Sequence, residues 1–203
     1  MIQVNRIYLI FNRLVTKKFL VDTSEYSCKM NPNLKQRIIK EAYRLFIAKG
    51  MKQTSFCDVA FAVHKSKGAV IHYFPSKRLL VDAVVKMCFF PASQLPTEID
   101  SAVEKNWDEF LRLYRNPIER VINSFPEQLN GNGLMHYMQF VSSAHEYMDD
   151  FSQMYQELFA KEQDFLSNMA CNHKMCVNDT AEFSRQILNT SIGKTFLGMF
   201  LKM

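Results

Sequence analysis

Glycine and proline are scarce in this sequence, which contains six of each among 203 residues. Runs of β-branched residues are also few, and no stretch alternates apolar and polar residues well enough to predict a strand. Long stretches instead repeat apolar residues three and four positions apart, a spacing typical of amphipathic helices. The sequence therefore predicts an all-α fold.

Signals for secretion and for membrane insertion are missing as well. The five cysteines are an odd number and lie mostly in segments with a helical pattern, which is typical of reduced intracellular thiols. The apolar run at residues 7–11 is too short for a signal peptide, and basic residues follow it closely. The apolar stretch at residues 187–201 is interrupted by Asn189 and Lys194 and is too short for a span. We therefore expect a cytoplasmic protein that does not enter a membrane.

Enzyme signals are equally weak. The sequence contains no nucleophile with a matching base, no paired carboxylates and no glycine-rich phosphate loop. His136, His145 and His173 are too scattered to predict a metal site. Cys171, His173 and Cys176 lie close together, which leaves a soft metal or a redox response open, but we prefer free thiols near a loop. We expect no enzyme activity, no cofactor and no metal.

Positive charge is concentrated in one part of the chain. The net charge of the whole protein is +5. Residues 35–86 contain eleven basic and three acidic residues, a net charge of +8, whereas residues 87–203 contain nine basic and fifteen acidic residues, a net charge of −6. A short basic module joined to a longer acidic one indicates that only the first part meets a polyanion.

Two helices are predicted at the start of the basic module. Ile38, Ala42 and Phe46 share one helical face, and Gly50 stands where a helix C-cap is expected. A capping box with an aspartate in the glutamate position, Ser55 to Asp58, marks the start of a short second helix.

Two further helices follow in the same module. Ser66 can cap a third helix, which ends at Pro75. Ser76 can cap a fourth, which we expect to run to Pro91. Its inward face is expected to carry Leu80, Ala83, Val84 and Met87.

The third helix has the features that a recognition helix needs. Val70 and Phe74 lie one turn apart and predict its inward face. The outward positions are Lys67, Gly68, Ile71 and His72. A glycine near the start of a helix lets the backbone approach phosphates, and a lysine beside it neutralises their charge. The spacing therefore predicts a helix-turn-helix that binds DNA.

The stretch from Arg37 to Leu80, about a quarter of the chain, resembles the DNA-binding segment of the TetR family of transcriptional regulators. The matching residues are Ala42, Phe46, Gly50, Thr54, Val59, Ala60, Ser66, Lys67, Gly68, Tyr73, Phe74, Ser76, Lys77 and Leu80. The resemblance implies a dimer that binds operator DNA through an N-terminal three-helix domain. It also implies a C-terminal helical bundle that binds a small molecule and changes the spacing of the two DNA-reading heads.

The sequence departs from the family pattern at four positions. His64 and Lys65 stand where the family usually has Gly and Val in the turn. Ala69 replaces a small hydroxyl residue and Ile71 replaces a tyrosine, and the family commonly uses both of those hydroxyls on phosphates. We predict that Lys65 and Lys67 compensate electrostatically and that Ile71 contacts a thymine methyl group.

These patterns divide the chain into three parts. Residues 1–33 are an N-terminal extension of weak periodicity, which we interpret as a basic arm that touches DNA, a poorly ordered segment or the product of a misassigned start codon. Residues 34–86 are the helix-turn-helix domain, and residues 87–203 are the effector-binding and dimerisation domain. The candidate DNA-binding residues are Thr54, Lys65, Ser66, Lys67, Gly68, Ile71, His72, Tyr73 and Lys77.

The second domain is rich in phenylalanine, methionine and tyrosine, which can line an apolar cavity or fill a helical core. The candidate effector-binding residues are Trp107, Phe110, Tyr114, Met135, Tyr137, Met138, Phe140, His145 and Met148. Two long apolar stripes, at residues 148–169 and 187–200, exceed what one thin bundle needs. We expect a homodimer through these late helices.

The leading hypothesis is a repressor that an apolar effector releases from a palindromic operator. Two alternatives remain: an interaction protein that keeps the fold without reading DNA, and a small-molecule-binding protein whose basic bundle is incidental.

Overall fold

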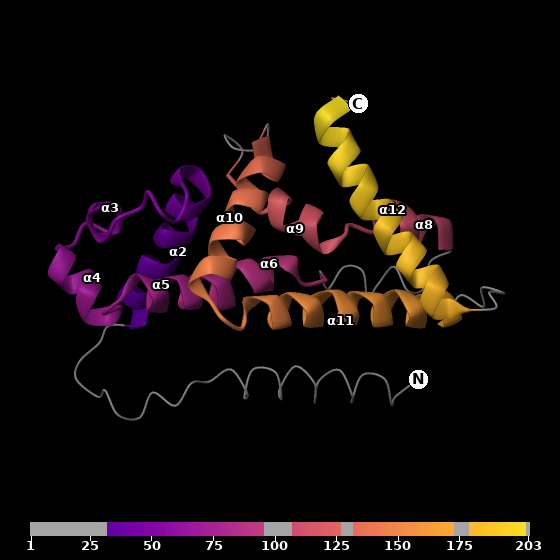
Figure 1. Ribbon diagram of the computed structural model, residues 1–203, viewed down its shortest axis with the longest axis horizontal. Helices are drawn as coiled ribbons and strands as arrows, with labels where there is room; N and C mark the ends of the chain where they lie inside the picture. The colour runs from indigo at the N-terminus through magenta and orange to yellow at the C-terminus, as the bar shows by residue number, and fades with distance from the viewer. Residues whose placement is uncertain (1–31, 96–106, 127–131, 173–178, 202–203) are drawn as a thin grey trace.

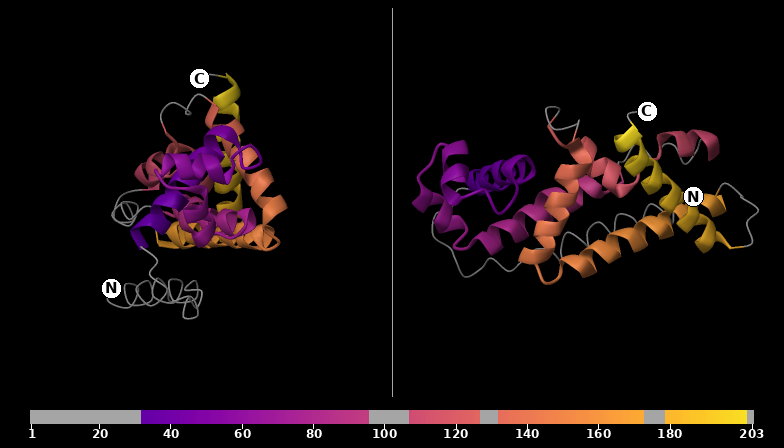
Figure 2. Two further views of the ribbon diagram at one scale, coloured as in Figure 1. Left: turned by 90° about the vertical axis from the view of Figure 1, so that its left-hand side faces the viewer. Right: turned by 45° about the horizontal axis from the view of Figure 1, so that its top comes forward.

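The computed structural model describes residues 32–95, 107–126, 132–172 and 179–201. Every regular element in these ranges is a helix, which confirms the all-α prediction. Figure 1 shows an elongated arrangement, with the first helices at one end, α8 and α12 at the other, and α11 along one side, and the right-hand view of Figure 2 shows the same order. Residues 1–31 of the expected extension lie outside the described part of the chain.

The first four helices described, within residues 32–84, are called the head here. These are α2 (Pro32–Lys49), α3 (Phe56–Ala62), α4 (Lys67–Tyr73) and α5 (Lys77–Val84). The last three begin at the expected caps. The side chain of Ser55 accepts from the Asp58 amide, Ser66 from the Ala69 amide and Ser76 from the Leu79 amide. Gly50 ends α2 with φ +90°, a left-handed conformation that glycine adopts without strain.

The fourth helix of the head continues beyond its predicted end. It passes from α5 into a π-helical turn, η1 (Val85–Phe89), and then into α6 (Phe90–Ser93). The prediction that Met87 faces inward is wrong, since its side chain is 51% exposed while Val85 and Phe89 are buried. A π-helical turn contains more residues than an α-helical one, so the buried positions after Val84 shift. The wider turn also lies immediately before α6, in which Pro91 stands in the first turn, where a proline is tolerated because its missing N–H is not needed.

The remaining helices form the second half of the molecule. They are α8 (Trp107–Leu113), α9 (Pro117–Asn123), α10 (Gly133–Tyr147), α11 (Phe151–Asn172) and α12 (Thr180–Leu201). Asn116 caps α9, with Pro117 at the first position. None of the described helices is long and apolar enough to cross a membrane.

Two hydrophobic clusters hold these helices together. The larger runs from α2 through α5 and η1 to α9 and α10, so it crosses the domain boundary expected after residue 86. The smaller joins Phe110 and Tyr114 to Leu166, Met169 and Leu188 on α11 and α12. Much of the two late apolar stripes is therefore buried inside a single chain, and the dimer through these helices stays a prediction.

Candidate functional site

Helix α4 presents the outward face that the sequence predicts. Val70 and Phe74 are buried in the larger cluster and fix the rotation of the helix. The opposite face leaves four side chains or backbone positions open to solvent, Lys67, Gly68, Ile71 and His72. The exposed face of this short helix is therefore available to a partner, as a recognition helix requires.

The turn between α3 and α4 depends on His64. This residue has φ +55°, the left-handed region that glycine occupies most readily. The Lys65 amide then donates to the Ala60 carbonyl at 2.9 Å. The histidine therefore adopts the conformation for which the TetR pattern provides a glycine, and the turn keeps its hydrogen bonds despite the departure.

Two lysines at the start of α4 have no acidic partner among the described residues. Lys65 and Lys67 are exposed and form no ion pair with any other residue in the described part of the chain. Ser66, between them, is exposed as well, and its side-chain oxygen accepts a hydrogen bond from the Ala69 amide at 3.2 Å. The result is an uncompensated positive edge at the start of α4.

Three other candidate DNA-binding residues lie where packing restrains them. Thr54 is 1% exposed, and its hydroxyl donates to the Gly50 carbonyl at 2.9 Å, so it supports the turn after α2. Tyr73 is half-buried. Lys77 turns toward α10: its Nζ donates to the Lys52 carbonyl at 3.2 Å and lies 5.8 Å from the centre of the Tyr147 ring. Burial lowers the pKa of the Lys77 ammonium group.

The head meets the second half of the molecule through exposed ion pairs that the sequence analysis did not foresee. Lys52 Nζ lies 2.7 Å from Glu146 Oε2, and Arg78 pairs with Asp149. Lys86, just beyond the head, lies 3.4 Å from Asp150 and 2.6 Å from Asp82. The hydrogen bond that Lys52 Nζ donates to the Glu146 carboxylate raises the pKa of Lys52. The only sequence signal was the crowding of acidic residues between α10 and α11.

The nine candidate effector-binding residues fall into three separate places. Trp107, Phe110 and Tyr114 belong to the smaller cluster, where neighbouring ring centres lie 5.2 and 5.8 Å apart. Three others are buried in the larger cluster, namely Tyr137, Phe140 and Met148. The last three are exposed on α10, namely Met135 (64%), Met138 (48%) and His145. These residues do not surround one common space.

A cavity of about 710 Å³ lies between α8, α9 and α12. Its lining residues are Leu111, Tyr114, Arg115, Glu119, Ile122, Asn123, Phe183, Gln186, Ile187, Thr190, Ser191, Lys194, Thr195 and Gly198. Among the nine candidates, Tyr114 alone belongs to this set. The volume is within the range of small-molecule sites, and the lining mixes apolar, hydroxyl, amide and charged groups.

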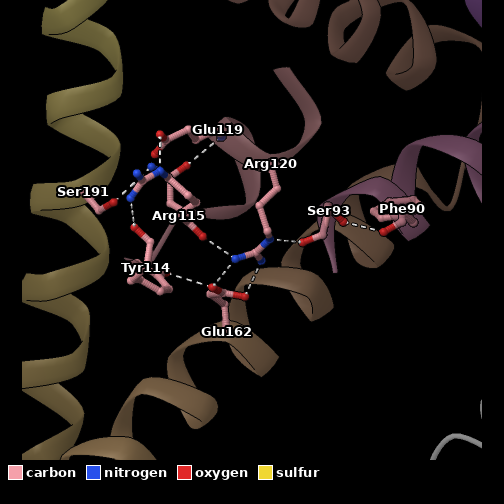
Figure 3. A network of polar contacts seen from close by, with 9 residues as sticks. Phe90, Ser93, Tyr114, Arg115, Glu119, Arg120, Glu162 and Ser191 are labelled. Carbon is pink, nitrogen blue, oxygen red and sulfur yellow. Dashed lines mark hydrogen bonds and ion pairs between the residues drawn. The ribbon is translucent and has the colours of Figure 1, made fainter. Parts of the chain in front are cut away.

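A buried polar network shares Tyr114 with this cavity, and Figure 3 shows the contacts of the network. The side chains of Arg120 and Glu162 are 7% and 3% exposed and form a two-point pair, with Nη2 to Oε2 at 2.7 Å and Nη1 to Oε1 at 3.0 Å. The Tyr114 hydroxyl donates to Glu162 Oε1 at 2.8 Å. Arg120 Nε donates to the Ser93 carbonyl, at the end of α6, at 2.8 Å.

The network fixes the protonation state of Tyr114. Burial, followed by the charge of Glu162, raises the pKa of the Tyr114 phenol well above its usual value, so the hydroxyl remains a donor. Sequence reasoning missed Arg120 and Glu162. The signal was present for Glu162, since Leu158, Phe159, Phe165 and Leu166 surround it on one helical face.

Metal binding finds no support among the described residues, where no group of three potential ligands lies close together. Cys57, Cys88 and Cys171 are free thiols. His173 and Cys176, the other members of the possible cluster near Cys171, lie outside the described residues.

Comparisons with known proteins agree with this geometry. Residues 38–84 match the family model of the bacterial regulatory proteins of the tetR family. No curated protein matches the sequence.

Solved structures with the same fold cover most of the chain. A candidate transcriptional regulator from Saccharomonospora viridis, in complex with choline, is 16% identical, with 83% of this chain and 88% of that one covered and a TM-score of 0.59. A TetR transcription regulator from Haloarcula marismortui ATCC 43049 is 17% identical, with 84% and 88% covered and a TM-score of 0.59. SmeT in complex with triclosan is 17% identical, with 83% and 81% covered and a TM-score of 0.51. The resemblance that the sequence indicated is thereby confirmed.

Proposed function

Because residues 38–84 match the tetR family and the chain has the fold of solved TetR regulators, we propose that it is a TetR-type regulator that binds operator DNA. One observation carries the proposal: α4 buries Val70 and Phe74 and exposes Lys67, Ile71 and His72 beside an unpaired Lys65. A helix held in this way can enter a major groove without any change in its packing.

The exposed residues divide into two roles. Lys65 and Lys67 contact phosphates, and their positive charge compensates for the phosphate hydrogen bonds that hydroxyls at positions 69 and 71 would donate. Ile71, which is 38% exposed, packs against a thymine methyl group, and His72 reaches a base edge. Lys77 packs between the head and α10, so its role is to position the head rather than to contact a phosphate directly.

Regulation requires a second copy and a small molecule. We propose that residues 87–203 contain both the effector site and the dimer contact. The dimer represses transcription from a palindromic operator, and binding of the effector releases it from that operator. The complexes of two similar structures, with choline and with triclosan, support a ligand site in this fold. In the bound dimer the two α4 helices lie about 34 Å apart, one turn of DNA.

The test is selection of bound sequences from a random duplex pool, followed by affinity measurements over a range of salt concentrations. We expect an inverted repeat, and an affinity that falls by about 10³ between low and moderately high salt. Lys67→Ala should weaken binding to all sequences and lower the salt slope by about 1, whereas Ile71→Ala should relax preference at one base pair. Lys161→Ala, an exposed cation on α11, is the matched control and should change neither.

A second function is favoured by one observation. Phe61, on α3 beside the turn, is 83% exposed, and the phosphate-binding hydroxyls of the family are absent. Both features suit a head that docks on a protein. A pool selection that enriches no repeat, with binding that ignores salt, would support this alternative over DNA recognition.

A further inference from the structure

The cavity between α8, α9 and α12 has an uneven distribution of charge. Arg115 Nε lies 3.0 Å from Glu119 Oε1, so these two opposite charges compensate each other. Lys194 lines the same cavity and forms no ion pair with any described residue. The cavity therefore keeps one uncompensated positive charge, on the α12 wall.

Hydrogen-bond donors lie on the same wall. Asn116 Nδ2 donates to Ser191 Oγ at 3.1 Å and to Thr195 Oγ1 at 2.8 Å, and it thereby ties α9 to α12. Ser191 Oγ accepts this bond and donates to no residue in the described ranges, so its hydrogen remains available to a ligand. A lysine and a hydroxyl donor three residues apart on one helix suit a carboxylate.

The rest of the lining is apolar. Phe183 and Ile187 lie on α12, and Leu111 and Ile122 face them from α8 and α9. Such a surface suits the hydrocarbon or aromatic body of a ligand, and the volume of about 710 Å³ leaves ample room for one.

The geometry points to this cavity as the effector site and to an organic carboxylate with an apolar body as its ligand. The proposal deepens the proposed function, on which its regulatory part rests. The cavity also shares Tyr114 with the buried network, and from Tyr114 a line of hydrogen bonds runs through Glu162 and Arg120 to the carbonyl of Ser93 (Figure 3).

Ser93 connects this line to the head. It ends the continuous helix of α5, η1 and α6, whose first residue, Lys77, follows α4 by only a short turn. A ligand that displaces the Tyr114 ring breaks its hydrogen bond to Glu162. Glu162 positions the guanidinium of Arg120, so the hydrogen bond from Arg120 to the Ser93 carbonyl at the end of that helix changes as well. Effector occupancy then biases the position of the head.

The site is tested without DNA, by calorimetric titration with 2-naphthoate and with its neutral isostere 2-naphthamide. We expect the wild-type protein to prefer the carboxylate, and Lys194→Met to weaken naphthoate binding by about tenfold while naphthamide binding changes less than about twofold. Lys161→Met, which removes an exposed cation outside the cavity, should leave both unchanged. Equal loss of both ligands in Lys194→Met, or no preference for the carboxylate, overturns the assignment.

The relay is tested with selected duplex DNA, by measuring naphthoate affinity with and without it. In the wild type, DNA should weaken naphthoate binding by about tenfold. Tyr114→Phe keeps the ring and removes the bond to Glu162, so the ratio between its own two naphthoate affinities, without and with DNA, should be close to one. Retention of the full ratio in Tyr114→Phe overturns the relay.

The two tests separate the possible failures. If the protein binds naphthoate through Lys194 but binds no duplex, the ligand site is supported and the proposed function is wrong. If the protein binds an inverted repeat but shows no preference for naphthoate over naphthamide, the proposed function is supported and the assignment of the ligand site is wrong.

Discussion

Among the described residues, the two halves of the chain differ in that only the second half buries an ion pair. In the head, polar side chains cap short helices, as Ser55, Ser66 and Ser76 do, or form exposed ion pairs. In the second half, Arg120 and Glu162 are buried in a network that joins α6, α8, α9 and α11. Exposed pairs contribute little to stability, whereas a buried charge without its partner is costly. The head can therefore vary its surface to suit a partner, while the second half tolerates few changes at its polar centre.

Removal of one buried partner should have the largest effect. Glu162→Ala leaves the guanidinium of Arg120 buried without its counter-charge, and we expect the free energy of unfolding to fall by about 3–5 kcal/mol. The measurement is urea denaturation at a fixed protein concentration. Asp164→Ala, an exposed carboxylate two residues along α11, should change stability by less than about 0.5 kcal/mol.

A paired replacement sharpens this result. Arg120→Met together with Glu162→Leu removes both charges, which in other buried pairs restores stability. Here the recovery should be partial, because the Ser93 and Arg115 carbonyls and the Tyr114 hydroxyl lose their partners. If Glu162→Ala were no worse than Asp164→Ala, the contrast between the two halves would be wrong.

The sequence predicted the head well because its signals are local. A cap and its amide are three residues apart, and the inward pair Val70 and Phe74 follows from helical spacing alone. The π-helical turn at Val85–Phe89 was missed because spacing assumes a constant number of residues per turn. Met87 was placed on the wrong face for that reason.

The second half was harder to predict because its features depend on contacts between distant segments. Arg120 and Glu162 are 42 residues apart in the chain. The nine candidate effector residues were chosen for their apolar or aromatic character, and such side chains fill a core as readily as they line a cavity. The polar wall of α12, with Ser191 and Lys194, carries no local motif that marks it as a binding surface.

A smaller effect should come from the turn of the head. His64 holds φ +55°, which costs a residue with a side chain about 1–2 kcal/mol relative to glycine. Part of this is offset because glycine gains freedom in the unfolded chain, so His64→Gly should raise the free energy of unfolding by about 0.5–1 kcal/mol. Lys65, at the next position, has no positive φ, so Lys65→Gly should lower the free energy of unfolding. Thermal unfolding distinguishes the two, and an equal loss from both would mean that the turn is unstrained.

The smallest effect is expected where the two halves meet. Arg78 and Asp149 are both exposed, so their coupling in a double-mutant cycle should be about 0.2–1 kcal/mol and should shrink further in high salt. The pair Arg44 and Glu41, three residues apart within α2, provides a control that joins no separate elements. The head and α10 also share the larger hydrophobic cluster, so buried side chains rather than these exposed pairs hold the two halves together. A coupling several times larger, and insensitive to salt, would instead mean that the pair Arg78 and Asp149 contributes to that contact as much as a buried pair does.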